Sequence, residues 1–186
     1  MKRCIVLILT AVLLLGCQRQ GEDLNNALSI RNKLLSSNGY QFDAVISADY
    51  GDKIYTFGMT CVVTGDGALS FTVTSPESIS GITGKISDSG GALTFDDKIL
   101  AFETIADGLV SPVTAPWLIL HTLRGGYIQS ACREDGLLHL TIDDSYQEND
   151  VETEIWLDSN DLPLRGEITW KGRRILTVDV KNFVYL

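Results

Sequence analysis

Apolar and polar residues alternate along most of this chain. In segment 42–50 every second side chain is apolar, and the same pattern recurs over 55–63 and 69–73. Such alternation places the apolar side chains on one face of a β-strand and the polar ones on the other. Gly51-Asp52 and Gly65-Asp66-Gly67 supply turns between these segments. The pattern therefore predicts three successive strands that share one apolar face.

Short apolar pieces later in the chain extend this pattern. They lie at 82–86, 93–95, 99–102, 127–133, 138–142, 151–157, 164–170 and 175–184, with turn residues between them. We therefore expect one mainly β (α+β) domain built on about ten antiparallel strands, a sheet long enough that it must curl, close or split into two.

Two segments have helical spacing instead. The first, 24–37, carries a leucine-rich stripe and ends at Asn38-Gly39. Arg31 lies within this stripe, either with its stem packed and its guanidinium in water, or as a buried latch or ligand contact. The second, 115–124, has Pro116 in its first turn and is followed by two glycines.

Two such helices can cover only part of the apolar face of about ten strands. If the sheet curls around them, an apolar hollow remains, whereas a two-sheet sandwich would fill itself. The residues expected to line the hollow are Phe42, Ile46, Phe57, Met59, Phe71 and Val73, with Trp117 on the covering helix and Arg31 at its side. Periodicity does not choose between these two outcomes.

The amino terminus indicates export. Met1-Lys2-Arg3 is basic, an apolar run follows, and the run ends in Leu14-Leu15-Gly16-Cys17. This ending resembles the lipobox of bacterial lipoproteins. The resemblance implies a signal peptide over 1–16, a lipidated tether over 17–23 that begins with acylated Cys17, and a folded domain over 24–186 on the extracytoplasmic face of the cell membrane.

Charge excludes nucleic acid as a partner. The chain has 15 basic and 24 acidic residues, a net charge of −9, and no basic patch. Loss of the signal peptide removes Lys2 and Arg3 and makes the mature chain still more acidic. An acidic domain is repelled by anionic lipids, so acyl chains must hold it at the membrane.

Catalytic and cofactor motifs are absent from the sequence, and neither an enzyme activity nor a bound cofactor or metal is expected. Paired acids such as Asp143-Asp144 fit solvated turns. His121 and His139 have no cysteine nearby in sequence. Cys61 and Cys132 are both expected to point inward, where they either form a disulfide or pack as small buried hydrophobes.

Four stretches together resemble the lipoprotein-carrier superfamily of LolA and LolB, and its Gram-positive GerS-like branch of germination lipoproteins. They are the helix running into a long strand at 24–50, Phe71-Thr72-Val73-Thr74-Ser75-Pro76-Glu77 with Ile79-Ser80-Gly81-Ile82, Leu93-Thr94-Phe95-Asp96, and Trp156-Leu157-Asp158 with Leu162-Pro163-Leu164 ahead of 176–183. The resemblance implies a strongly curved antiparallel sheet, or incomplete β-barrel, with helices in its hollow.

Two functions follow from this resemblance and from the area mismatch. In the first, the hollow binds an acyl chain, a lipoprotein or another apolar ligand. In the second, the hollow is filled, and the lipoprotein is a non-catalytic scaffold that docks an envelope or spore-cortex enzyme.

Replacement of Cys17 by serine tests the anchor. Because only a thiol can receive the diacylglyceryl group, Cys17→Ser should accumulate as an unprocessed precursor that takes up no radiolabelled fatty acid. Labelling equal to that of the natural chain would contradict lipidation at Cys17.

Overall fold

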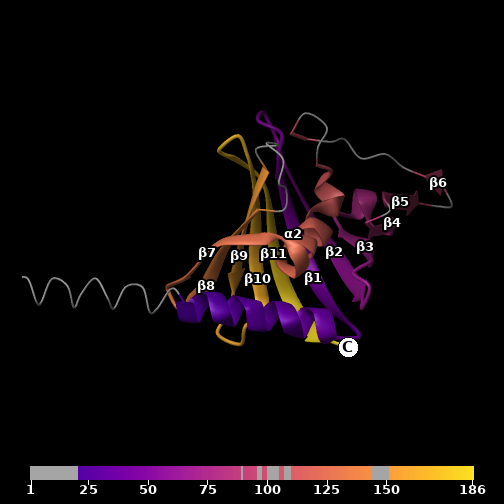
Figure 1. The fold of residues 1–186 in the computed structure, drawn as a ribbon. Helices are drawn as coiled ribbons and strands as arrows, with labels where there is room; N and C mark the ends of the chain where they lie inside the picture. The colour runs from indigo at the N-terminus through magenta and orange to yellow at the C-terminus, as the bar shows by residue number, and fades with distance from the viewer. Residues whose placement is uncertain (1–20, 89, 96–97, 100–104, 107–109, 144–150) are drawn as a thin grey trace, which may run out of the picture.

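A single antiparallel sheet forms most of the molecule (Figure 1). The structure is a computed structural model that describes residues 21–186 except 89, 96–97, 100–104, 107–109 and 144–150. The sheet has 11 strands in the order β6-β5-β4-β3-β2-β1-β11-β10-β9-β8-β7. Their bounds are β1 Gly39–Asp49, β2 Ile54–Thr64, β3 Leu69–Ser75, β4 Thr83–Ser87, β5 Gly90–Phe95, β6 Lys98–Ile99, β7 Tyr127–Glu134, β8 Leu137–Asp143, β9 Val151–Leu157, β10 Pro163–Trp170 and β11 Arg173–Tyr185.

The two ends of the domain meet at the middle of the sheet. β1 pairs with β11, so that Ile46 lies opposite Val178 and Ala44 opposite Val180. From this central pair, β2 to β6 extend in one direction and β10 to β7 in the other. Every other strand neighbour in the sheet is also its neighbour in sequence, which is the arrangement that short turns favour.

The apolar faces of the strands coincide across the sheet. In β1 and β2, Phe42 lies opposite Cys61 and Ile46 opposite Phe57, and Cys61 lies opposite Phe71 of β3. These side chains are at most 6% exposed and belong to one core cluster. The period of two in the sequence sets this outcome, because a shift by one residue would turn the apolar set to the other face.

Two helices contribute to the same core. The N-terminal helix is described over 21–36 and lies across one end of the strands (Figure 1), with Ala27, Ile30 and Leu34 buried. Helix α2 (Ala115–Gly125) follows the 3-10 turn η2 (Pro112–Thr114) and buries Ile119, Leu120 and Leu123. Within the described residues, no helix is both long enough and apolar enough to cross a bilayer.

The sheet thus curls around its helices instead of splitting into a sandwich. The fold class expected from the alternating pattern, a mainly β, strongly curved antiparallel sheet with two covering helices, is confirmed. Of the strand expected over 99–102, β6 includes only residue 99, and 100–102 lie outside the described residues. Cys17, the signal peptide and the tether up to residue 20 lie outside them as well.

Close approach of α2 to the sheet depends on Gly166 in β10. A Cβ atom at this position would collide with the side chain of Ile119 from α2. Glycine is therefore required here for packing, although it weakens a strand by itself.

Replacement of Gly166 by valine should lower the free energy of unfolding by about 1–3 kcal/mol, the usual cost of overpacking a core. Chemical denaturation measures this change. Gly125→Ala is the matched control: it adds a Cβ at the end of α2 where no atom lies within 4 Å, and it should leave stability equal or slightly higher. Equal stability of Gly166→Val and the natural chain would contradict the close contact.

Candidate functional site

The candidate functional site is the attachment of α2 over the apolar face of the sheet. Arg31 of the N-terminal helix reaches the C-terminal end of α2, where its Nε donates to the Leu123 carbonyl at 2.8 Å and its Nη2 to the Gly126 carbonyl at 2.7 Å. The last carbonyls of a helix lack partners within it and carry partial negative charge. Arg31 therefore caps α2 and ties the two helices together, as the latch interpretation of the sequence expects.

The turn between β2 and β3 holds α2 from another side. Arg124 Nη2 donates to the Gly65 carbonyl at 3.0 Å, and Trp117 Nε1 donates to the Gly67 carbonyl at 3.2 Å. His121 lies 3.3 Å from Asp88, in the β4–β5 turn, and stacks on Trp117 with ring centroids 4.6 Å apart. These contacts are made at the edges of the helix, outside its apolar face.

A pocket of about 170 Å³ lies within this ring of contacts. Its apolar wall includes Leu35 of the N-terminal helix, Val63 of β2, and Trp117 and Leu120 of α2. Its polar wall is formed by Tyr40, Asp66, Asp88, His121 and Arg124. The pocket therefore has an apolar wall that continues into the core and a polar wall that carries charged side chains.

Two buried polar atoms on the pocket wall have no hydrogen-bond partner within the described part of the chain. They are the Tyr40 hydroxyl and Arg124 Nη1. Burial raises the pKa of Tyr40, and the Arg124 side chain opposes that rise through its hydrogen-bonding approach to the Tyr40 hydroxyl and through its positive charge. Buried polar groups are nearly always paired, so an unpaired donor and hydroxyl on one pocket wall are suited to a polar ligand group or water.

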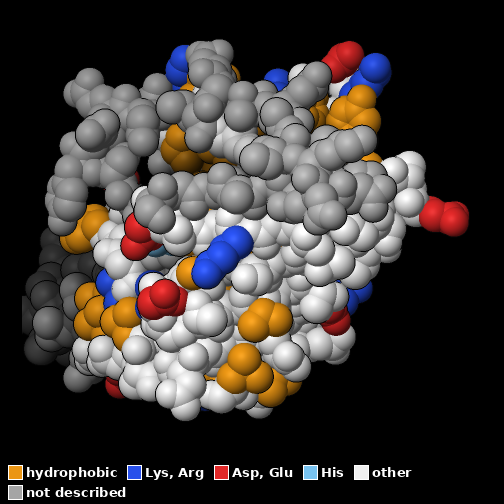
Figure 2. All heavy atoms as spheres, turned by 90° about the vertical axis from the view of Figure 1, so that its right-hand side faces the viewer, with side chains coloured by type: hydrophobic (Ala, Val, Ile, Leu, Met, Phe, Trp, Pro, Cys, Tyr) orange, Lys and Arg blue, Asp and Glu red, His pale blue; other side chains and the backbone are white. Residues whose placement is uncertain are grey.

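The structure places the residues predicted to line a hollow inside the core. Phe42, Ile46, Phe57, Met59, Phe71 and Val73 are all buried there, while Trp117 lines the pocket and Arg31 fastens the helix above it. Together with side chains of the two helices, the sheet residues form one core cluster among the described residues. Figure 2 shows one face of the molecule, on which hydrophobic side chains form small separate clusters.

Arg124, Tyr40 and His121 are site residues that the sequence analysis missed. A basic residue in the last turn of a helix is ordinary, and Tyr40 looks like the first apolar residue of a strand. Only the β2–β3 turn, which is distant in sequence, gives them a common position.

The two cysteines correct an expectation. Cys61 is buried on β2, but Cys132 is exposed on β7, and both are free. Five strands separate β2 from β7 in the sheet, so the neighbouring strands that a disulfide between them requires are absent. Burial raises the pKa of Cys61 to about 12, which makes it an inert packing residue.

Comparison with known proteins places the fold. No protein-family model matches the chain, and no curated protein does. Among solved structures, it is similar to a DUF1329 family protein from Desulfovibrio piger, with TM-score 0.50, 12% identity and coverage of 90% of this chain and 93% of the other. This likeness, at low identity, shows the fold alone.

Two further structural matches are weaker. A LolA superfamily protein from Nitrosomonas europaea has TM-score 0.44 and 12% identity, with coverage of 84% of this chain and 92% of that one. A chain in the complex of the CwlD amidase from Clostridioides difficile with the GerS lipoprotein has TM-score 0.47 and 13% identity, with coverage of 85% and 92%.

Replacement of Arg31 by leucine should loosen α2. One hydrogen bond from a charged group contributes about 1.5–3 kcal/mol, so loss of even one of the two should speed amide hydrogen exchange in α2 by roughly 10–100-fold. Asn32→Ala, an exposed change in the adjacent position of the helix, should leave exchange unaltered. Unchanged protection of α2 in Arg31→Leu would contradict the latch.

Proposed function

We propose that this protein is an exported, lipid-anchored, non-catalytic lipoprotein whose apolar hollow takes an acyl chain, the lipid of a lipoprotein or a similar apolar ligand. One observation carries the proposal. The helix that covers the apolar face is tied at its edges by Arg31, Arg124 and Trp117, each of which donates to a backbone carbonyl. Such contacts can break and re-form without disturbing the ladder of the sheet.

Displacement of α2 would be needed for binding. The pocket of about 170 Å³ is smaller than the roughly 300–1,000 Å³ of typical ligand sites. An acyl chain that inserted from this pocket would replace Leu120 and Ile119 against the sheet, so that one apolar surface is exchanged for another. The free energy cost of opening is then limited to the edge contacts and the helix side chains left in water.

Arg124 offers a donor for the headgroup of a ligand, on a wall that also carries Asp66 and Asp88. Its Nη1 is buried and unpaired, and the Tyr40 hydroxyl on the same wall can donate a second hydrogen bond. A carboxylate or phosphate at this position would satisfy both donors while its apolar tail pointed toward Trp117 and Leu120.

The anchor supports a location at a membrane. Cys17 precedes Gly21, the first described residue of the N-terminal helix, by only a few residues. Acylation at Cys17 would hold the helix, and the Arg31 contact with α2, within reach of the bilayer surface. A lipid ligand would then be available beside the mouth of the pocket.

A second candidate is the docking of an envelope or spore-cortex enzyme, as in the GerS-like branch. The observation that favours it is an exposed apolar stripe on the N-terminal helix, where Leu24, Leu28 and Leu35 are 38%, 42% and 49% exposed. These residues follow helical spacing on the side turned away from the core.

Titration with a fluorescent fatty acid tests the first candidate. A Trp156→Phe/Trp170→Phe form of residues 18–186 retains Trp117 as its one tryptophan. Because Trp117 lines the pocket, its emission should change saturably as ligand binds, and Arg124→Gln should weaken binding of the acid by roughly tenfold, as loss of a charge-assisted hydrogen bond does.

Two controls separate the candidates. Phe71→Asp places an unpaired charge on the apolar face and should abolish binding or folding. Leu24→Ser/Leu28→Ser changes no residue of the pocket wall and should reduce enzyme docking without affecting binding of the fatty acid. Absence of a saturable Trp117 response in a folded protein would overturn the acyl-ligand proposal and leave the scaffold.

A further inference from the structure

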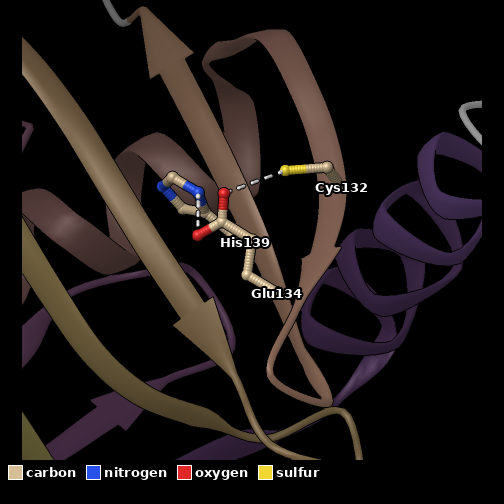
Figure 3. Close-up of side chains that lie close together, drawn as sticks. All are labelled: Cys132, Glu134 and His139. Carbon is tan, nitrogen blue, oxygen red and sulfur yellow. Dashed lines mark hydrogen bonds and ion pairs between the residues drawn. The ribbon is translucent and has the colours of Figure 1, made fainter.

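The hairpin of β7 and β8 brings three metal-ligating side chains together on the outer face of the sheet (Figure 3). Cys132 and Glu134 lie two residues apart on β7, and His139 on β8 is paired directly with Cys132. The flanking Leu138 and Leu140 are buried in the core, so His139 points to the opposite face. Strand register, and not sequence proximity, supplies the cysteine that His139 lacks in the linear chain.

The distances among these side chains suit one small ion. The carboxylate of Glu134 lies between the other two groups (Figure 3), with Oε1 at 3.8 Å from Cys132 Sγ and Oε2 at 3.6 Å from His139 Nδ1. All three ligand atoms fall within 4.8 Å of one another. Tetrahedral Zn²⁺, with bonds of about 2.0–2.3 Å, separates its ligands by about 3.4–3.6 Å. Small side-chain rotations would therefore complete the coordination.

His139 is already oriented for coordination through Nδ1. Its ring stacks on Trp156, with centroids 4.4 Å apart and planes inclined by 3°. Its Nε2 faces Glu154 Oε1 at 3.5 Å and is buried without a hydrogen bond among the described residues. A carboxylate beside the distal nitrogen is the usual second partner of a metal-binding histidine, because it holds the proton there and leaves the other lone pair free.

Charge favours a cation at this position. Two carboxylates, Glu134 and Glu154, flank one imidazole, and the neighbouring Arg133 is directed to Asp23 at 3.4 Å. Without a cation, a neutral His139 with its proton on Nε2 would present a lone pair to the Glu134 carboxylate. A metal ion between the two groups removes that repulsion.

We propose that Cys132, Glu134 and His139 bind a divalent cation of the Zn²⁺ class, with water in the fourth position. Thiolate, imidazole and carboxylate together select Zn²⁺ over the hard ions Mg²⁺ and Ca²⁺. Binding releases the thiol proton of Cys132 to solvent as the Sγ–metal bond forms. The ion joins the edge strand β7 to its neighbour β8. It also protects the exposed thiol of Cys132 from oxidation.

Cobalt substitution tests the site in the full chain under reducing conditions. A Cys4→Ser/Cys17→Ser background leaves Cys61 and Cys132 as the only thiols. Co²⁺ should bind with one-to-one stoichiometry and produce a thiolate-to-cobalt charge-transfer band, which Zn²⁺ then removes. Millimolar Mg²⁺ should leave the band unchanged.

Single variants in that background assign the ligands. Cys132→Ser should abolish the charge-transfer band, whereas Cys61→Ser should retain it. His139→Gln should weaken Zn²⁺ binding more strongly than Glu154→Gln, for which a loss of about 10–100-fold is expected. His121→Gln is the matched histidine control and should bind like the background. Circular dichroism verifies that each variant is folded.

Three results would overturn the proposal. They are the absence of stoichiometric binding in folded protein, a charge-transfer band that survives Cys132→Ser, and displacement of the ion by Mg²⁺, which indicates adsorption to surface acids. Protons on both nitrogens of His139 with Zn²⁺ in excess, seen by NMR, would identify an imidazolium between two carboxylates and would exclude the site.

Discussion

One constraint organises this molecule: a single open antiparallel sheet has a continuous apolar face that must be kept from water. The strands β1, β2 and β3 alone bury Phe42, Ile46, Phe57 and Phe71 on that face. The two helices supply complementary side chains, among them Leu34 and Leu123, and one core results. Curvature of the sheet is what allows two short helices to cover it, since a flat sheet of 11 strands would leave its edges bare.

Apolar burial alone would hold α2 against the sheet without fixing its position. Position comes from polar contacts at the edges, where Arg31, Arg124 and Trp117 donate to backbone carbonyls of other segments. Hydrogen bonds of this kind are directional, whereas the hydrophobic effect is proportional to area and has no preferred geometry. The hydrogen bonds fix the position of α2, whereas the apolar contacts do not. Loss of the hydrogen bonds alone would therefore let α2 move as a unit over the apolar surface.

The outer face of the sheet does not have to be covered. Its polar side chains can stay in contact with water, so cross-strand neighbours on this face can interact through polar groups. The hydroxyls of Ser130 and Thr141, for example, are hydrogen-bonded at 3.0 Å. The pairs Cys132–His139 and His139–Trp156 belong to this face. A rigid hairpin at the end of a sheet holds such groups at fixed separations, which a loop would not do.

Local pattern and tertiary pairing contributed differently to this protein. Alternation over 42–50 and 55–63 determined which side chains face the core, because a strand has a period of two, and Pro116 with Gly125-Gly126 determined the limits of α2. The place of Arg31 in a helical stripe left open whether its guanidinium lies in water or acts as a latch, because its partners at the end of α2 lie more than 90 residues away in sequence. Strand order and register could not be predicted from the local pattern either. The order separates Cys61 from Cys132, and the register pairs Cys132 with His139. Side-chain periodicity is a local property of the sequence, whereas the choice of neighbouring strand depends on how all the strands of the sheet pair.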